Sequence, residues 1–150
     1  MFSGDRVVAL DRAFELAGRV AGPMEQALAV RGLTVSQAHV LYALDQLGPL
    51  VQRELAERLG RTPRHVTTLV DALEAAGLVA RAPHPTDRRA TMVSLTERGE
   101  ATTGRMHDER RAAAEALLAD PTPSELRGFV STVDALLRRL DEFAGDQAGR

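Results

Sequence analysis

The chain has 150 residues, of which 44% are hydrophobic and 27% charged, and its formal net charge is −2. This length is typical of one compact domain that buries about 70% of the surface of its unfolded chain. The sequence contains no cysteine, which excludes disulfides, thiolate metal sites and thiol chemistry. No apolar run approaches the ~20 residues of a membrane span, and the N-terminus lacks a signal-peptide pattern. We therefore expect a cytoplasmic protein.

A long amphipathic helix is predicted over residues 5–30. Its apolar residues, such as Val7, Leu10 and Phe14, recur at helical spacing. Gly22-Pro23 interrupts the pattern, and proline lacks the backbone N–H and crowds the preceding turn. We therefore expect a kink or a break at this point.

Two shorter helices are predicted to follow. Thr34 and Gln37 form a capping-box pattern at the start of the first, which ends before Gly48. The second covers residues 52–59 and is closed by Gly60, a residue that readily adopts the left-handed conformation found after helices.

The next predicted helix, which starts at Thr62-Pro63 and ends before Gly77, has two different faces. One face is an apolar stripe with spacing i, i+3, i+4, i+7, formed by Val66, Leu69, Val70 and Leu73. Another face is polar with the same spacing, formed by Arg64, Thr67, Thr68 and Asp71. A helix that is buried along one face and carries Arg and short hydrogen-bonding side chains on another suits the DNA major groove.

A β-hairpin is predicted after this helix, with strands over residues 78–82 and 91–96. Its polar loop carries Asp87, Arg88 and Arg89. From residue 61 to residue 95, five Arg stand against three acidic residues, so this segment is locally basic. Two short helices followed by a charged hairpin are typical of a winged helix-turn-helix, and DNA binding is the leading hypothesis.

Two further helices are predicted at the C-terminal end. Thr96 caps a helix that extends to about residue 119, and Thr122 with Glu125 forms a second capping box. The last helix carries an apolar stripe formed by Leu126, Phe129, Val130, Val133, Leu136, Leu137 and Leu140. Because the winged module has a small core of its own, we expect the terminal stripes to pack in a homodimer. Burial in the core of a single chain is the alternative.

The predicted fold is mainly α with a small β-hairpin wing, in a single domain over residues 1–150. Residues 33–96 form a winged helix-turn-helix lobe that binds DNA. Residues 5–32 and 97–145 form the N- and C-terminal dimerisation helices that flank it. A two-fold dimer presents two recognition helices to a palindromic site.

In these features the chain resembles the MarR family of bacterial transcriptional regulators. The motifs that carry the likeness are, in chain order, Leu33-Thr34-x-x-Gln37, Glu54-Leu55-Ala56-Glu57-Arg58-Leu59, Leu69-Val70-Asp71-x-Leu73-Glu74-x-x-Gly77-Leu78-Val79, Asp87-Arg88-Arg89-Ala90 and Leu95-Thr96-Glu97-x-Gly99. Each motif is weak alone, but together, in this order, they are specific. The resemblance implies an obligate dimer with recognition helices in adjacent major grooves and wings in the flanking minor grooves. It also implies repression that a small, often aromatic or anionic, molecule relieves.

The resemblance assigns the Arg of the wing motif Asp-x-Arg to Arg89, with Asp87 holding it by a bidentate contact. One position departs from the family pattern. Val51 stands where many relatives carry the Thr or Ser that caps the first helix of the helix-turn-helix. The loss of such a cap costs about 1 kcal/mol of local stability.

The candidate DNA-binding residues are Arg61, Thr62, Arg64, His65, Thr67, Thr68, Asp87, Arg88 and Arg89. Arg89 is expected in the minor groove, whose negative potential attracts Arg; a solvated loop Arg is the alternative. Arg64 is expected to bind guanine O6 and N7 or, almost equally, a phosphate. Arg61 and Thr62 are expected to bind phosphate, and the role of His65 stays open.

His39 and Tyr42 are candidates for the wall of the effector cleft that the resemblance implies. The zinc-sensing branch of the family uses His residues from two helices, and His39 and His107 fall in comparable elements. However, Arg111 stands one turn after His107, where a second His would be expected. We therefore expect no metal and no cofactor.

The leading function is that of a sequence-specific transcriptional regulator that represses its own or a neighbouring operon. The alternative is a winged-helix protein-interaction module without specific DNA binding, but such a module would be expected to lose the wing Arg and the polar helix face. An enzyme is not expected, because there is no Cys, Gly-rich phosphate loop, HExxH or GxSxG. The expected partners are a pseudo-palindromic DNA operator, a second copy of the chain and a small aromatic or anionic effector, but not a membrane.

Overall fold

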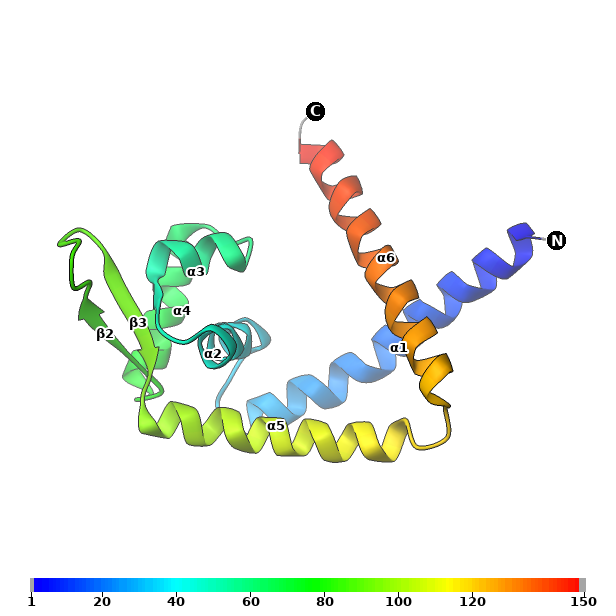
Figure 1. The fold of residues 1–150 in the computed structure, drawn as a ribbon, viewed down its shortest axis with the longest axis horizontal. Coiled ribbons are helices and arrows are strands. Elements are labelled where there is room, and N and C mark those ends of the chain that lie inside the picture. Colours follow the sequence, from blue (N-terminus) through cyan, green and yellow to red (C-terminus); the bar gives the residue numbers. More distant parts are fainter. Residues whose placement is uncertain (1, 149–150) are drawn as a thin grey trace. The chain divides into compact units, whose positions relative to one another are not determined.

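The computed structural model describes residues 2–148. Its elements, in chain order, are α1 (Phe2–Ala29), α2 (Val35–Leu47), β1 (Leu50–Val51), α3 (Gln52–Arg58), α4 (Pro63–Ala75), β2 (Val79–Pro83), β3 (Thr91–Leu95), α5 (Glu97–Leu117) and α6 (Pro123–Ala148) (Figure 1). The predicted mainly α fold with a small β-hairpin wing is therefore confirmed. The chain divides into two compact units, with the boundary inside α5 between Met106 and His107. None of the described helices is both long and apolar enough to cross a membrane.

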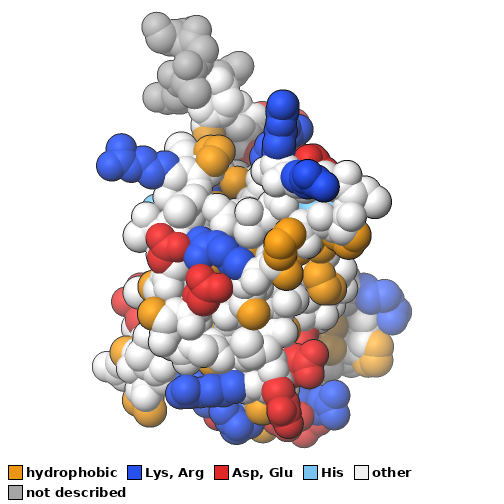
Figure 2. All heavy atoms as spheres, turned by 90° about the vertical axis from the view of Figure 1, so that its left-hand side faces the viewer, with side chains coloured by type: hydrophobic (Ala, Val, Ile, Leu, Met, Phe, Trp, Pro, Cys, Tyr) orange, Lys and Arg blue, Asp and Glu red, His pale blue; other side chains and the backbone are white. Residues whose placement is uncertain are grey.

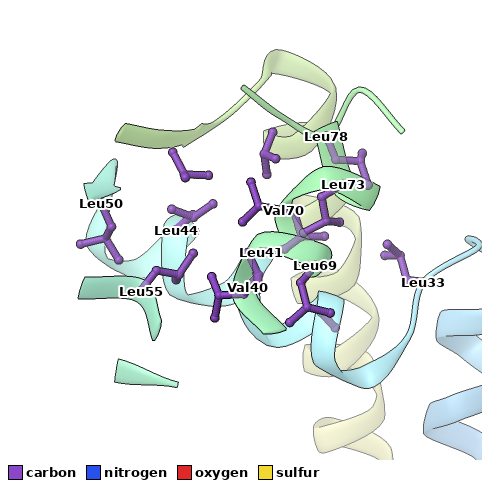
Figure 3. Close-up of a cluster of buried hydrophobic side chains, with 14 of the residues drawn as sticks. Leu33, Val40, Leu41, Leu44, Leu50, Leu55, Leu69, Val70, Leu73 and Leu78 are labelled. Atoms are coloured by element: carbon purple, nitrogen blue, oxygen red, sulfur yellow. The ribbon is translucent and has the colours of Figure 1, made fainter. Parts of the chain in front are cut away.

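The hydrophobic core lies in the first unit, where α2, α3 and α4 pack with the sheet (Figure 3). The stripe predicted for α4 is buried along its whole length, at Val66, Leu69, Val70 and Leu73. Burial of such a side chain stabilises the fold by about 1.5–3 kcal/mol. This burial fixes the rotation of α4, so the polar face of the same helix turns away from the core.

The predicted helix caps are present. The Thr34 hydroxyl accepts from the Gln37 backbone N–H at 3.2 Å, and the Thr34 backbone N–H donates to the Gln37 side chain at 2.8 Å. In α4, the Thr62 hydroxyl accepts from the backbone N–H of His65 at 3.2 Å. Val51 precedes α3 without a side-chain cap, as its apolar side chain requires.

The sheet has one strand more than the hairpin that the sequence predicts. Its order is β1-β3-β2, all antiparallel, with Leu50 opposite Val93 and Val51 opposite Met92. A two-residue strand is too short to show the alternation by which strands are recognised in a sequence. Because α3 starts directly after β1, this pairing ties the first helix of the helix-turn-helix to the hairpin.

Of the kink or break predicted at Gly22-Pro23, the break is wrong, because α1 continues through Pro23. A proline inside a helix removes one backbone hydrogen bond and costs roughly 3 kcal/mol relative to Ala. Residues 24–29 are Met, Glu, Gln, Ala, Leu and Ala, all strong helix formers, and they carry the helix onward. The helix then joins the core of the first unit at the buried Leu28.

The second unit contains α6, which begins with the predicted capping box. The Glu125 carboxylate accepts from the Thr122 hydroxyl at 2.7 Å and from the Thr122 backbone N–H at 2.8 Å. These two hydrogen bonds lower the pKa of Glu125. The large apolar residues of α6 that stay exposed are Phe129, Val130, Leu136, Leu137, Leu140 and Phe143.

The start of α5 meets the start of β2 at a position that admits only glycine. The Thr96 hydroxyl accepts from the Gly99 backbone N–H at 3.0 Å and donates to the Gly77 carbonyl at 2.7 Å. A Cβ atom at Gly99 would lie 2.0 Å from the carbonyl oxygen of Leu78. Gly99 therefore lets α5 approach the hairpin backbone directly.

We predict that Gly99→Ala lowers the free energy of unfolding by about 1–3 kcal/mol or more, because the backbone of Leu78 must shift to admit the methyl group. Urea denaturation measures the change. The control is Gly104→Ala on the same helix, where a Cβ atom meets nothing within 4 Å. That variant should gain roughly 0.5–1 kcal/mol. Equal stabilities of the two variants would contradict the close approach at Gly99.

Candidate DNA-binding surface

Five of the nine predicted DNA-binding residues are exposed on the N-terminal half of α4 or just before it. Arg61 and Thr62 precede the helix, and Arg64, His65 and Thr68 lie on it; all five are exposed. The Thr68 hydroxyl donates to the Arg64 carbonyl at 3.2 Å. This end of α4 therefore presents cationic and hydrogen-bonding groups together, as a helix that reads base edges with its N-terminal residues requires.

Thr67 differs from these residues because protein partners occupy its hydroxyl. The hydroxyl donates to the Pro63 carbonyl at 2.9 Å and accepts from the Gln52 side-chain amide at 2.8 Å. Thr67 is also half-buried. Its hydroxyl links α4 to α3, so a DNA contact by Thr67 remains a prediction that these bonds do not favour.

Arg81 on β2 joins the hairpin to α4. Its side chain, only 22% exposed, makes two ion pairs, to Asp71 at 2.7 Å and to Glu74 at 2.8 Å. The Arg81 backbone N–H donates to the same Glu74 carboxylate at 3.1 Å. The guanidinium also donates from Nε to the Gln52 side chain at 3.1 Å and to the Thr67 carbonyl at 3.4 Å. One side chain thus ties together α3, α4 and β2.

The wing tip lies in the loop between β2 and β3 and exposes Asp87, Arg88 and Arg89. Asp87 Oδ1 accepts from the backbone N–H of Arg89 at 2.9 Å. Among the described residues, no ion pair joins the two side chains. Asp87 therefore shapes the backbone of the loop, and the bidentate contact that the resemblance implied is not formed within the described residues.

His84 holds the same loop from the other side. Its Nδ1 accepts from the backbone N–H groups of Thr86 and Asp87, at 3.2 and 3.1 Å. Its own backbone N–H donates to the Ala90 carbonyl at 3.1 Å. The side chains of His84 and Asp87 and one backbone hydrogen bond therefore order this loop.

A hollow of about 580 Å³ lies between the start of α3 and the wing. Its walls are formed by Val51, Gln52, Arg53 and Glu54 on one side and by His84, Asp87, Arg89, Ala90 and Thr91 on the other. Seen from the side of the hairpin, basic side chains project along the upper edge of the molecule, while acidic and basic side chains lie next to one another at mid-height (Figure 2). The basic character is therefore local, as the net charge of −2 requires.

The candidate effector residues lie on α2, where His39 is exposed and Tyr42 is half-buried against the core. His107 lies just beyond the boundary of the first unit and is half-buried. Within residues that the structure describes, no three His, Asp or Glu side chains come together in a way that could hold a metal ion.

Sequence reasoning missed the residues that hold these parts together. Gln52, Arg81 and His84 gave no motif, since each acts through partners distant in the sequence or through its own loop backbone. One signal was available: Arg81 interrupts a strand whose other residues are Val, Ala and Pro. A lone cation in such a strand suggests an ion-pair partner across the fold.

Comparison with known proteins places these features in context. A family model described as "MarR family" matches residues 33–91. The HTH-type transcriptional repressor Rv2887 of Mycobacterium tuberculosis is 34% identical over 110 residues, which cover 73% of this chain and 79% of that protein. The HTH-type transcriptional repressor MdtR of Bacillus subtilis is 33% identical over 103 residues, 69% of this chain and 66% of the repressor. The match thus spans just under two thirds of the length of MdtR.

Solved structures extend the likeness beyond the lobe. RV1404 from Mycobacterium tuberculosis superposes with a TM-score of 0.72 at 28% identity, covering 92% of this chain and 94% of that chain. AbsC, a MarR family transcriptional regulator from Streptomyces coelicolor, gives a TM-score of 0.77 at 20% identity, with 95% and 98% of the chains covered. The second match shows a shared fold that includes the helices outside residues 33–91.

We predict that Arg81→Met lowers the free energy of unfolding by about 1–3 kcal/mol, because Asp71 and Glu74 lose their partner while the aliphatic stem is kept. Chemical denaturation measures the loss. Arg53→Met is the matched control, since it breaks an ion pair with Glu57 whose partners are 82% and 66% exposed. Such a surface pair contributes roughly 0–1 kcal/mol. Equal losses in the two variants would show that the Arg81 contacts add nothing beyond a surface pair.

Proposed function

The chain belongs to the MarR family and is a DNA-binding transcriptional regulator; on this premise, we propose that it is a dimeric repressor. In this proposal it binds a pseudo-palindromic operator next to its own gene or a neighbouring operon. A small aromatic or anionic molecule releases it from the DNA. It acts in the cytoplasm by binding rather than by catalysis, without metal or cofactor.

One observation carries the proposal: α4 and the wing, the two parts that would read DNA, are joined through Arg81. Two reading elements in a fixed relation to each other suit neighbouring grooves of one duplex. In the proposal, α4 enters the major groove with Arg64, His65, Thr67 and Thr68, while Arg61 and Thr62 bind phosphates. The wing brings Arg89 to the minor groove and Arg88 to a phosphate, with Asp87 shaping the loop between them.

The exposed apolar faces of the terminal helices support a dimer. On α1 the exposed large apolar residues are Val7, Val8, Leu10, Phe14, Leu16, Val20 and Met24. Such contiguous apolar surface on two helices is typical of an interface. We assign residues 5–32 and 97–145 to dimerisation and residues 33–96 to DNA binding. A two-fold axis would then give each half of an operator one α4 and one wing.

Repression is proposed from the names of Rv2887 and MdtR, each an HTH-type transcriptional repressor. The effector is proposed to bind beside α2, near His39 and Tyr42, because an exposed imidazole and a half-buried phenol suit an aromatic or anionic ligand. The alternative function, a protein-interaction module, is less well supported because Arg89 and the exposed polar residues of α4 are retained.

Arg89→Ala is predicted to weaken binding to a duplex that the wild-type protein selects from a random library. The expected loss is about 1–3 kcal/mol per half-site, with unchanged helix content. Fluorescence anisotropy near physiological salt measures the affinity for this duplex and for a shuffled one. The wild-type protein should bind the selected duplex ~10³-fold more tightly than the shuffled one. Arg6→Ala, outside the DNA-binding lobe, removes the same charge as a control. Full-strength binding by the Arg89 variant would refute the role of the wing.

A homodimer predicts a mass in solution of twice the 16.2 kDa of one chain, measured by light scattering after gel filtration. Leu137→Asp places a charge on the exposed apolar face of α6 and should shift the protein toward monomer, with weaker specific binding. Ser131→Asp, on the polar side of the same helix, should remain dimeric. A dimer that tolerates Leu137→Asp as well as Ser131→Asp would exclude this face from the interface.

A further inference from the structure

Within the described residues, one ring nitrogen of His84 accepts hydrogen bonds and the other has no partner. Its Nδ1 accepts from the backbone N–H groups of Thr86 and Asp87. A backbone N–H can only donate, so Nδ1 carries no proton, and in the neutral ring the proton lies on Nε2. Among the described residues, no hydrogen bond to Nε2 is formed. The wing thus fixes an imidazole with one free donor.

This free donor belongs to the hollow between α3 and the wing. His84 is half-buried and lines the hollow. Because Nδ1 is bonded to the loop backbone, Nε2 is the ring nitrogen left for a contact outside the loop. A space of about 580 Å³ leaves room for a phosphodiester group.

The geometry of a duplex brings a phosphate to this position. A single sugar–phosphate strand separates a major groove from the neighbouring minor groove. A protein that places α4 in one groove and its wing in the other must straddle that strand. The hollow lies between the start of α3 and the wing, and Gln52 of its lining is hydrogen-bonded to Thr67 of α4 at 2.8 Å.

We propose that the hollow binds a phosphate of this strand and that the Nε2–H of His84 donates a hydrogen bond to this phosphate. The proposal rests on the proposed contact of α4 and the wing with DNA. It adds a DNA-binding residue that lies outside the recognition helix and outside the Asp-x-Arg motif of the wing.

The charges around the hollow explain why a directed donor matters. Arg53 and Arg89 are balanced by Glu54 and Asp87, so with a neutral imidazole the formal charges of the lining sum to zero. Net attraction alone does not hold a phosphate here. A hydrogen bond from a fixed N–H to an anionic oxygen is stronger than one between neutral groups, and its direction selects the position of the phosphate.

The test uses His84→Asn in the full-length protein. The Asn side-chain oxygen sits near the position of Nδ1 and can accept from the same backbone N–H groups, as Asn commonly does in turns, while the distal donor is lost. His84→Ala, which loses both functions, is the reference for a loosened loop. Hydrogen exchange at the amides of Thr86 and Asp87 should stay protected in the Asn variant and rise in the Ala variant.

Binding is measured by anisotropy at pH 8, above the ordinary range in which imidazole titrates, on a duplex selected by the wild-type protein. His84→Asn is expected to bind about tenfold more weakly per half-site. The slope of log affinity against log salt should stay the same, because a neutral donor displaces no counterion. Wild-type affinity in His84→Asn overturns the proposal, as does a change of about one in the slope.

A second readout identifies the phosphate. Single neutral methylphosphonate groups are introduced one at a time along the strand between the two grooves. At one position the substitution should lower the DNA affinity of the wild-type protein and cause no further loss of affinity in His84→Asn. If no position behaves in this way, the hollow does not bind a phosphate. If the wild-type protein selects no duplex at all, the proposed function fails first, and the proposal with it.

Discussion

The arrangement of the DNA-binding surface depends on one guanidinium, that of Arg81. It reaches two carboxylates of α4, Asp71 and Glu74, and the side chain of Gln52 at the start of α3. The hairpin also packs on the helices through Val79 and Val93, which are buried in the shared core. Charge-assisted hydrogen bonds are directional. Those of Arg81 therefore hold α4 and β2 together and also fix the distance between them.

Hydrogen bonds between side chains and the backbone order the wing tip as well. The loop between β2 and β3 is exposed along most of its length, so no buried core orders it. His84 and Asp87 supply acceptors for three of the loop amides, those of Thr86, Asp87 and Arg89. A loop ordered before binding loses less conformational entropy on binding, which leaves more of the contact energy for affinity.

Local signals in the sequence were enough for most elements. The apolar stripe of α4, the hydroxyl caps at Thr34, Thr62 and Thr122, and the hairpin strands act between residues close in sequence, so their patterns predicted them. The break predicted at Pro23 was wrong, because helix formers downstream outweigh one missing hydrogen bond. The sequence prediction also missed β1, because two residues form a strand only when β3 is beside them.

The sequence by itself therefore determined the order of elements, the buried face of α4 and the identity of the cationic residues that could meet DNA. Only the tertiary structure decided which polar residues face outward and which hold the protein together. Thr67 and Arg81 look like free surface groups in the sequence, yet both are engaged within the fold. The physical reason is that ion pairs and hydrogen bonds between distant residues depend on the packing of the core, which leaves no periodic trace in the chain.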